Sequence, residues 1–196
     1  MRAGMSASDE PMRIEVERRH IHRLLNHGPV TLVSVAHEGR RNVMAAAWVM
    51  PLDFEPPKFL AVIAADTFTR ELLAASRQCV LHAPTSAQTD LVYAVGTHSG
   101  RDEDKFEKHG IATSPARTVA APLVDGCAAW IECKVIDEPG IAERYDLFIL
   151  EATCAWADDA LFQSGRWKFT PGGPRTIHHE AGGRFFATGE TIEARR

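Results

Sequence analysis

The chain has 196 residues, of which 45% are hydrophobic, with 22 lysines and arginines against 26 aspartates and glutamates. At this length a single globular domain can bury about 70% of the surface that its unfolded chain exposes. A net charge of -4, without long blocks of one sign, provides no basic surface for a nucleic acid or an anionic membrane. No apolar run approaches the roughly 18 residues of a membrane span. We therefore expect neither nucleic acid nor membrane as a partner.

The start of the chain and its cysteines bear on processing and compartment. Residues 1–13 lack an apolar signal core, so we expect a mobile leader ahead of one domain over residues 14–196. The spacing of the cysteines favours buried free thiols, in a protein of a reducing cytoplasm. The four cysteines lie in apolar runs and form no C-x-x-C pair: Cys79, Cys127, Cys133 and Cys154.

The first half of the chain alternates between strand and helix patterns. Apolar residues at helical spacing predict helices, and alternation with a period of two predicts strands. In chain order the predicted elements are a helix over 15–26, a hairpin of strands over 29–36 and 42–50, a strand over 58–65, a helix over 66–77 capped by Asp66 or Thr67, a strand over 79–83, and short helices over 85–95 and 102–110.

The second half returns to strands, over 127–137 and 144–157, and becomes loop-like from Gly165 onward. Such a tail seldom forms a core of its own, so we expect it to wrap across the domain or across a partner subunit. Five or six strands with short helices, and no regular βαβ alternation, predict a mainly β fold built on an antiparallel barrel.

Familiar catalytic motifs are absent from the sequence. It has no G-x-S-x-G, G-x-x-x-x-G-K-[ST], H-E-x-x-H or G-x-G-x-x-G pattern, so a dinucleotide bound in a Rossmann crevice is not expected. His98 and Ser99 suggest a nucleophile, but no orienting acid is identifiable beside them.

Nine histidines raise the question of a metal site. His20 and His22 are two apart on a predicted helix, so their side chains point in different directions, and the adjacent His178 and His179 diverge in extended chain. No third ligand follows at a recognisable spacing. We therefore predict no metal ion.

The segment DTFTREL, residues 66–72, carries groups that suit an anion. It leads from a buried strand into a helix and offers free backbone N–H groups, the hydroxyls of Thr67 and Thr69, and the guanidinium of Arg70. Taken alone, the segment is more simply an ordinary capped helix.

The segment SGRDEDKF, residues 99–106, carries two further cations. Arg101 and Lys105 are four residues apart, so on a helical turn both side chains could converge on one anion. Three acidic residues in the same stretch make a solvated charged face an equally good interpretation.

The run from Asn42 to Trp48 places three alanines between a polar residue and a bulky aromatic one. Small side chains allow a flat group to lie close to the backbone, whose N–H groups can then reach polar atoms on its edge. Taken alone, the run is more simply a buried strand beside a tightly packed neighbour.

Together, these segments resemble the flavin reductase-like family, the FMN-binding split barrels that include flavoredoxins and NAD(P)H:flavin oxidoreductases. The resemblance implies a six-stranded antiparallel split β-barrel, a homodimer, and FMN near the subunit interface. The matching segments follow the family's order and cover nearly all of residues 20–190: they are 23–35, 42–57, 66–72, 99–106, 121–137 and 176–190.

The resemblance also implies which residues contact FMN. Ala45 stands where relatives often carry threonine and His82 where many carry asparagine, and both departures bear on how tightly the flavin is held. The implied contacts are Asn42, Val43, Met44, Ala45, Ala46, Ala47 and Trp48 alongside the isoalloxazine ring, Thr67, Thr69 and Arg70 at the phosphate, Ser99, Gly100, Arg101 and Lys105 in the loop that closes the site, and His82.

The function implied is FMN-dependent oxidation of NADH or NADPH, with electrons passed to free flavin or to a partner oxygenase. A flavoredoxin-like electron carrier with little NAD(P)H activity is the alternative, and a split barrel recruited for haem or another ligand is a third. Hydride chemistry belongs to the cofactor, so we predict no acid–base catalyst in the protein.

Overall fold

The computed structural model describes residues 16–19, 24 and 28–195. The expected leader over 1–13 and most of the helix expected over 15–26 lie outside the described residues. The assignment of 14–196 to a single domain stays a prediction.

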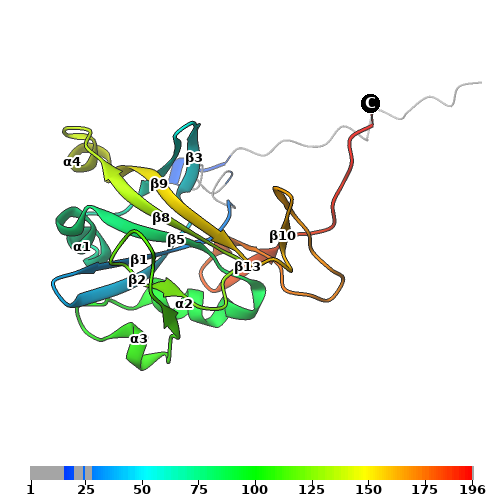
Figure 1. Ribbon diagram of the computed structural model, residues 1–196, viewed down its shortest axis with the longest axis horizontal. Helices are drawn as coiled ribbons and strands as arrows, with labels where there is room; N and C mark the ends of the chain where they lie inside the picture. Colours follow the sequence, from blue (N-terminus) through cyan, green and yellow to red (C-terminus); the bar gives the residue numbers. More distant parts are fainter. Residues whose placement is uncertain (1–15, 20–23, 25–27, 196) are drawn as a thin grey trace, which may run out of the picture.

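One antiparallel sheet of seven strands dominates the structure (Figure 1). Its strands lie in the order β2-β1-β5-β8-β9-β4-β3, and each pairs with the next in antiparallel register. The strands are β1 (Thr31–His37), β2 (Arg40–Ala46), β3 (Val49–Phe54), β4 (Pro57–Val62), β5 (Gln78–Ala83), β8 (Ala129–Ile136) and β9 (Leu147–Ala157).

The prediction of one continuous strand over 42–50 is wrong, because β2 ends at Ala46 and β3 begins at Val49. These two strands form opposite edges of the sheet, and this break adds a seventh strand to the six that the resemblance implied. Three Cα–Cα steps span at most about 11 Å. The sheet must therefore curl until its two edges approach one another at Ala47 and Trp48.

In the described part of the chain, four α-helices accompany the sheet. Thr67 is the N-cap of the first, because its Oγ1 accepts a hydrogen bond from the Arg70 backbone N–H at 3.2 Å. The helix over 141–145 was not predicted and displaces the start of the strand expected at 144 to Leu147. The helices are α1 (Phe68–Ser76), α2 (Thr89–Thr97) after a 3-10 turn (Ser86–Gln88), α3 (Lys105–Lys108) and α4 (Ile141–Tyr145).

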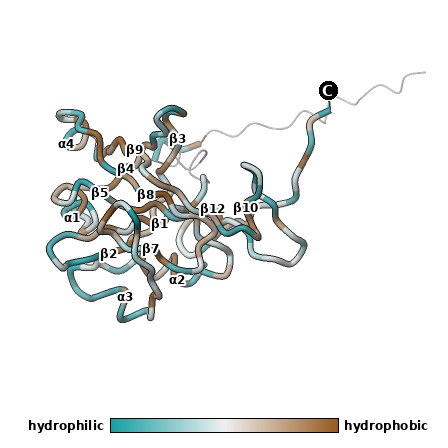
Figure 2. Tube along the Cα trace, viewed as in Figure 1, coloured by the Kyte–Doolittle hydropathy of each residue, from teal (hydrophilic) through white to brown (hydrophobic). Residues whose placement is uncertain are grey.

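The core has two main parts, one on each side of β1, and Figure 2 shows hydrophobic positions along the strands of the sheet and hydrophilic ones around α3. Leu32, Val33 and Val35 in β1 have no exposed surface, because β1 is covered on both faces. The first part, which includes Val33, Val35, Ile63, Leu72, Leu81 and Leu150, packs α1 on the sheet. The second, which includes Leu32, Val43, Val92, Val95, Phe106 and Ile177, packs α2 and α3 on β1 and β2.

The tail folds back on the rest of the chain instead of forming a separate core. Ile177 is buried among residues of β1 and α2, and bridges join His178 to Pro29 and Thr176 to Thr85. These contacts place residues 176–178 of the tail against the rest of the chain. The remaining short strands are β6 (Thr113–Ser114), β7 (Leu123–Val124), β10 (Phe162–Gln163), β11 (Arg166–Trp167), β12 (Ile177–Ala181) and β13 (Arg184–Ala187).

Candidate functional site

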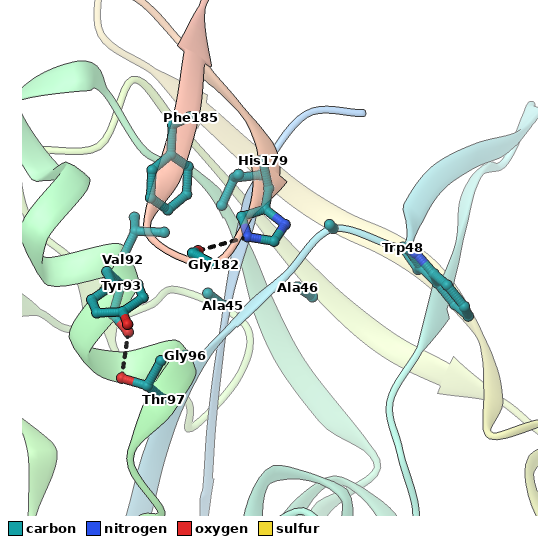
Figure 3. Close-up of a pocket in the computed structure, with 12 residues that line it drawn as sticks. Ala45, Ala46, Trp48, Val92, Tyr93, Gly96, Thr97, His179, Gly182 and Phe185 are labelled. Carbon is teal, nitrogen blue, oxygen red and sulfur yellow. Dashed lines mark hydrogen bonds between the residues drawn. The ribbon is translucent and has the colours of Figure 1, made fainter. Parts of the chain in front are cut away.

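An apolar hollow of about 290 Å³ lies where the two edges of the sheet approach one another (Figure 3). At its tail side, His179 Nε2 donates to the Gly182 carbonyl at 3.0 Å, which holds the turn between β12 and β13. The lining consists of Ala45, Ala46, Ala47 and Trp48 from the sheet edge, Val92, Tyr93, Gly96 and Thr97 from α2, and Val30, His179, Gly182 and Phe185.

The small side chains of Ala45, Ala46 and Ala47 line the hollow, and that of Ala45 also allows α2 to pack closely on β2. A Cβ on Gly96 would lie 3.2 Å from Ala45 Cβ, so α2 and β2 approach more closely than larger side chains would allow. Val43 and Ala45 belong to the core around α2, whereas Met44 and Ala46 belong to the core around α1. Val43 is fully buried and lines neither hollow, so its predicted place alongside the ring is not seen.

A second, polar hollow of about 240 Å³ adjoins the first. Gly96 and Thr97, at the C-terminal end of α2, line both hollows. The polar hollow is lined by Asn42, Met44, Asp66, Thr67, Phe68, Thr69, Val95, Gly96, Thr97, His98, Ser99, Gly100 and Lys105. The predicted phosphate and loop contacts that lie together here are Thr67, Thr69, Ser99, Gly100 and Lys105. Asn42 and Met44, predicted alongside the ring, line this polar hollow and not the apolar one.

Asn42, Thr69 and Gly100 form a tight cluster in the wall of the polar hollow. Asn42 Nδ2 donates to Thr69 Oγ1 at 2.9 Å, and both side chains are buried. A Cβ on Gly100 would overlap the Asn42 amide and lie 2.9 Å from Phe68 Cδ1. Glycine at this position therefore lets the loop after α2 close against β2.

Lys105 is the cation that the structure places in the polar hollow. Its side chain is only 3% exposed, and Nζ donates to the carbonyls of Val43 at 3.0 Å and Val95 at 2.7 Å. Burial lowers the pKa of Lys105 to about 8, although the nearby Glu103 charge opposes that shift. An ammonium has three donors, so one remains for an anion in the hollow.

Arg70 points away from the polar hollow, contrary to its predicted role at the phosphate. Its guanidinium donates to the Ile63 and Ala142 carbonyls and to Asp146 Oδ1, at 2.9–3.2 Å. It also lies 4.7 Å from the centre of the Phe148 ring. The physical reason is α4: the Ala142 carbonyl, which also accepts the Asp146 backbone N–H, and the Asp146 carboxylate attract the guanidinium to the opposite side of α1.

Arg101 does not converge with Lys105 on one site. Its guanidinium donates to the Asp66 carbonyl at 2.8 Å and to Glu71 Oε2 at 3.1 Å, where Arg40 also binds Glu71. Arg40 and Arg101 line an open charged hollow that does not include Lys105. Arg101 is thus engaged with α1 at the surface, whereas Lys105 is buried beneath the loop.

His82 lies apart from both hollows around α2. Its Nδ1 donates to the Leu32 carbonyl at 3.0 Å, and its Nε2 accepts from the Val124 N–H at 2.9 Å. Burial lowers the pKa of His82 to about 4, so the ring is neutral at physiological pH. It lines a different, apolar hollow with residues such as Phe59 and Ile131, and its observed role is to join β1 to β7.

Some residues of the site were absent from the sequence-based prediction. Tyr93 and Thr97 from α2, and His179 and Phe185 from the tail, line the apolar hollow (Figure 3). The helical pattern over 85–95 and the expected wrapping of the tail located their elements. Which side chains face the hollow depends on how α2 and β12–β13 pack, and no motif in the sequence specifies that.

A family model described as "Flavin reductase like domain" matches residues 23–171. The chain belongs to the flavin reductase-like family. The resemblance inferred from the ordered segments is therefore confirmed.

Individual relatives agree with this membership. This flavin reductase-like protein is 41% identical over 184 residues to the uncharacterized protein YddH of Escherichia coli (strain K12), across 92% of this chain and 97% of the relative. A crystal structure of an FMN-binding domain of a flavin reductases-like enzyme from Shewanella baltica OS155 is 43% identical, with a TM-score of 0.82 over 92% of this chain and 96% of that one.

A more distant likeness is to the flavoredoxin of Desulfovibrio vulgaris (Miyazaki F), at 25% identity and a TM-score of 0.74 over 85% of this chain and 90% of that one. With these structural likenesses, the predicted fold class, mainly β with short helices and of the split-barrel type, is confirmed. Among the described residues, no helix has the length and apolar character that a membrane span requires.

Proposed function

We propose that this protein binds FMN across the two adjoining hollows and transfers electrons from NADH or NADPH to free flavin or to a partner acceptor such as an oxygenase. The meeting of an apolar and a polar hollow at Gly96 and Thr97 carries this proposal. FMN has the same division, with a flat ring system at one end and a strongly anionic phosphate at the other. Together the hollows reach the size of small-molecule sites, roughly 300–1,000 Å³.

In this proposal the polar hollow holds the phosphate. Lys105 supplies a buried positive charge, and the hydroxyl of Ser99 and the backbone N–H groups at the start of α1 supply donors. The Thr67 hydroxyl donates to the Ala64 carbonyl and caps α1. Asn42 and Thr69 hold the wall through their hydrogen bond. Arg70 and Arg101 act outside the hollow, where they fix α4 and the loop after α2.

The apolar hollow holds the ring in this proposal. The backbone from Ala45 to Trp48 provides a surface with small side chains, while Tyr93 and Phe185 supply aromatic area opposite. Bound FMN would supply the hydride and electron chemistry, and the protein's contribution is to orient the ring and exclude water.

A flavoredoxin-like electron carrier is the second candidate function, favoured by the likeness to the Desulfovibrio flavoredoxin. An NAD(P)H oxidation assay on protein reconstituted with FMN distinguishes the two functions. A reductase oxidises NADH or NADPH when free flavin or a ferric acceptor is supplied, whereas a carrier keeps its FMN and accepts electrons only from a partner or a chemical reductant. Failure to quench FMN fluorescence would refute both and favour a barrel that holds haem or another ligand.

We also propose a homodimer with FMN near the subunit interface. The support is a row of exposed apolar side chains on β3, next to the apolar hollow, where Met50 is 57% exposed and Phe54 is 97% exposed. Clusters of exposed apolar side chains commonly mark association surfaces. Size-exclusion chromatography with light scattering tests it: the wild type should run as a dimer and Met50→Glu as a monomer, and a monomeric wild type would contradict it.

The proposed compartment is a reducing cytoplasm. All four cysteines are unpaired, and three of them are buried. Free buried thiols are typical of proteins that function where disulfides do not persist.

A further inference from the structure

Within the described part of the chain, the side chains of His98, Glu103 and His109 come together beside the polar hollow. One ligand-type atom from each residue lies within 4.8 Å of the other two. His98 is the residue that follows α2, His109 the residue that follows α3, and Glu103 belongs to the loop between them. The histidines are eleven residues apart in sequence, which matches no simple ligand motif.

In the part of the chain that the structure describes, Glu103 and His109 each have a buried polar atom without a hydrogen-bond partner. Glu103 Oε1 and His109 Nε2 are both buried, and neither has a hydrogen-bond partner among the described residues. They face each other at 3.7 Å, which is too long for a hydrogen bond. Buried polar atoms are nearly always satisfied, so two orphans that face each other indicate a group between them.

The separation suits a metal ion. Zn²⁺ binds imidazole nitrogen and carboxylate oxygen at about 2.0–2.2 Å, which puts two ligands of a tetrahedral ion about 3.3–3.6 Å apart. The observed 3.7 Å between Glu103 Oε1 and His109 Nε2 needs only a small contraction to reach that range.

His98 has the tautomer that a third ligand needs. Its Nδ1 donates to the Ala94 carbonyl at 3.0 Å, which leaves the lone pair of the ring on Nε2. A hydrogen bond from the second ring nitrogen to a backbone carbonyl is the usual support of a metal-binding histidine. Lys108 binds the other carboxylate oxygen of Glu103 and so orients Oε1 toward His109.

The surrounding charges also favour a cation at this point. The site lies at the C-terminal end of α2, where the helix dipole is negative. Glu103 contributes a carboxylate, and Lys108 binds only its other oxygen, Oε2. Two neutral imidazoles and one carboxylate are a ligand set that zinc commonly accepts with a fourth position open.

We propose that His98, Glu103 and His109 form a Zn²⁺ site that ties the end of α2 to the end of α3. The bound ion would hold in place the loop that carries Ser99 and Gly100. The proposal departs from the expectation of no metal ion, and it does not depend on flavin binding.

Zn²⁺ alone is the probe for the test. Protein stripped with a chelator and then titrated with Zn²⁺ in a calorimeter should bind one ion per chain. His109→Ala and Glu103→Gln should each weaken that binding by at least about tenfold, the scale seen when metal sites lose a supporting group. His37→Ala is the matched control, since His37 lies at the end of β1 outside the group and should leave the affinity unchanged.

Two further measurements keep the test decisive. Circular dichroism shows whether each variant is folded, and Glu103→Gln preserves shape if His109→Ala does not fold. X-ray absorption should show nitrogen and oxygen at about 2.0–2.2 Å and no sulfur. Sulfur ligation, an affinity unaffected by either variant, or no bound ion would overturn the proposal and leave an ordinary His–Glu pair.

Discussion

At the residue scale, the two cations of the predicted anion-binding segment 99–106 make very different contacts. Lys105 is buried with two backbone carbonyls on its ammonium, whereas Arg101 is half exposed and paired with Glu71. A buried charge keeps more of its Coulombic effect than an exposed one, which solvent screens. Only Lys105 lines the polar hollow.

We expect Lys105→Met to weaken FMN binding by about 1.5–3 kcal/mol, because it removes a charge-assisted hydrogen bond to the phosphate. Titration of flavin fluorescence measures the dissociation constant. Arg101→Met, with the same side chain introduced four residues away, is the matched control and should change the constant less than threefold. Equal losses in the two variants would place the phosphate outside the polar hollow.

Gly100 is the second position where a single residue decides the geometry. We expect Gly100→Ala to destabilise the fold by about 1–3 kcal/mol, because the new methyl group overlaps Asn42 and approaches Phe68. Chemical denaturation measures the loss. In a double-mutant cycle with Asn42→Ala, which opens room for the methyl group, the two effects should be less than additive. Strict additivity would mean that the overlap with Asn42 is not the cause.

At the scale of elements, α4 explains why Arg70 does not face the polar hollow. Arg70 leaves α1 toward the Ala142 carbonyl and Asp146, which flank the C-terminal end of α4. Its side chain is 13% exposed, so these contacts are largely shielded from solvent. Arg70 therefore fastens α4 to α1.

We expect Arg70→Ala to lower the free energy of unfolding by about 1–3 kcal/mol, because it removes the donor of the Ile63 carbonyl and of the Asp146 carboxylate and one of the two hydrogen bonds to the Ala142 carbonyl. Thermal or chemical denaturation measures that loss. FMN affinity in the same variant should stay within about twofold of the wild type. A large loss of affinity with unchanged stability would return Arg70 to the phosphate site.

At the scale of the whole molecule, two buried titratable groups connect the sheet to the segments that cover it. His82 joins β1 to β7, and Glu132 in β8 accepts hydrogen bonds from Thr118 and Trp156. Burial alone would raise the pKa of Glu132, but its hydrogen bonds, including one from the Arg117 N–H, outweigh burial and lower the pKa from 4.5 to about 2.

These shifts predict two steps of acid destabilisation. His82 has its pKa lowered from 6.5 to about 4, so the unfolded chain binds its proton first and stability falls as pH drops from 6.5 to 4. Glu132 adds a loss of about 2–4 kcal/mol as pH drops from about 4.5 toward 2. Unfolding free energies across pH 2–8 measure both, and His82→Gln and Glu132→Gln should each remove one step. Unchanged pH profiles in both variants would contradict the assignment.

The local patterns of the sequence were sufficient to predict most of the helices and strands and the family. The cap at Thr67, the strand at 79–83 and the paired strands of the second half depend on neighbours in the chain, so periodicity and capping chemistry predict them. The ordered segments likewise predicted the flavin reductase-like family, which the family model confirmed.

The direction of side chains and the closure of the barrel depended on contacts between distant parts of the chain. Ala47 and Trp48 join two sheet edges because β3 pairs with β4 instead of continuing β2. Arg70 faces α4 because the Asp146 carboxylate and the Ala142 carbonyl accept its hydrogen bonds, and both lie more than 70 residues away in the sequence. The sequence by itself determined the family and the residues available to a site, while the packing of α2, α3 and α4 decided which of them share a hollow.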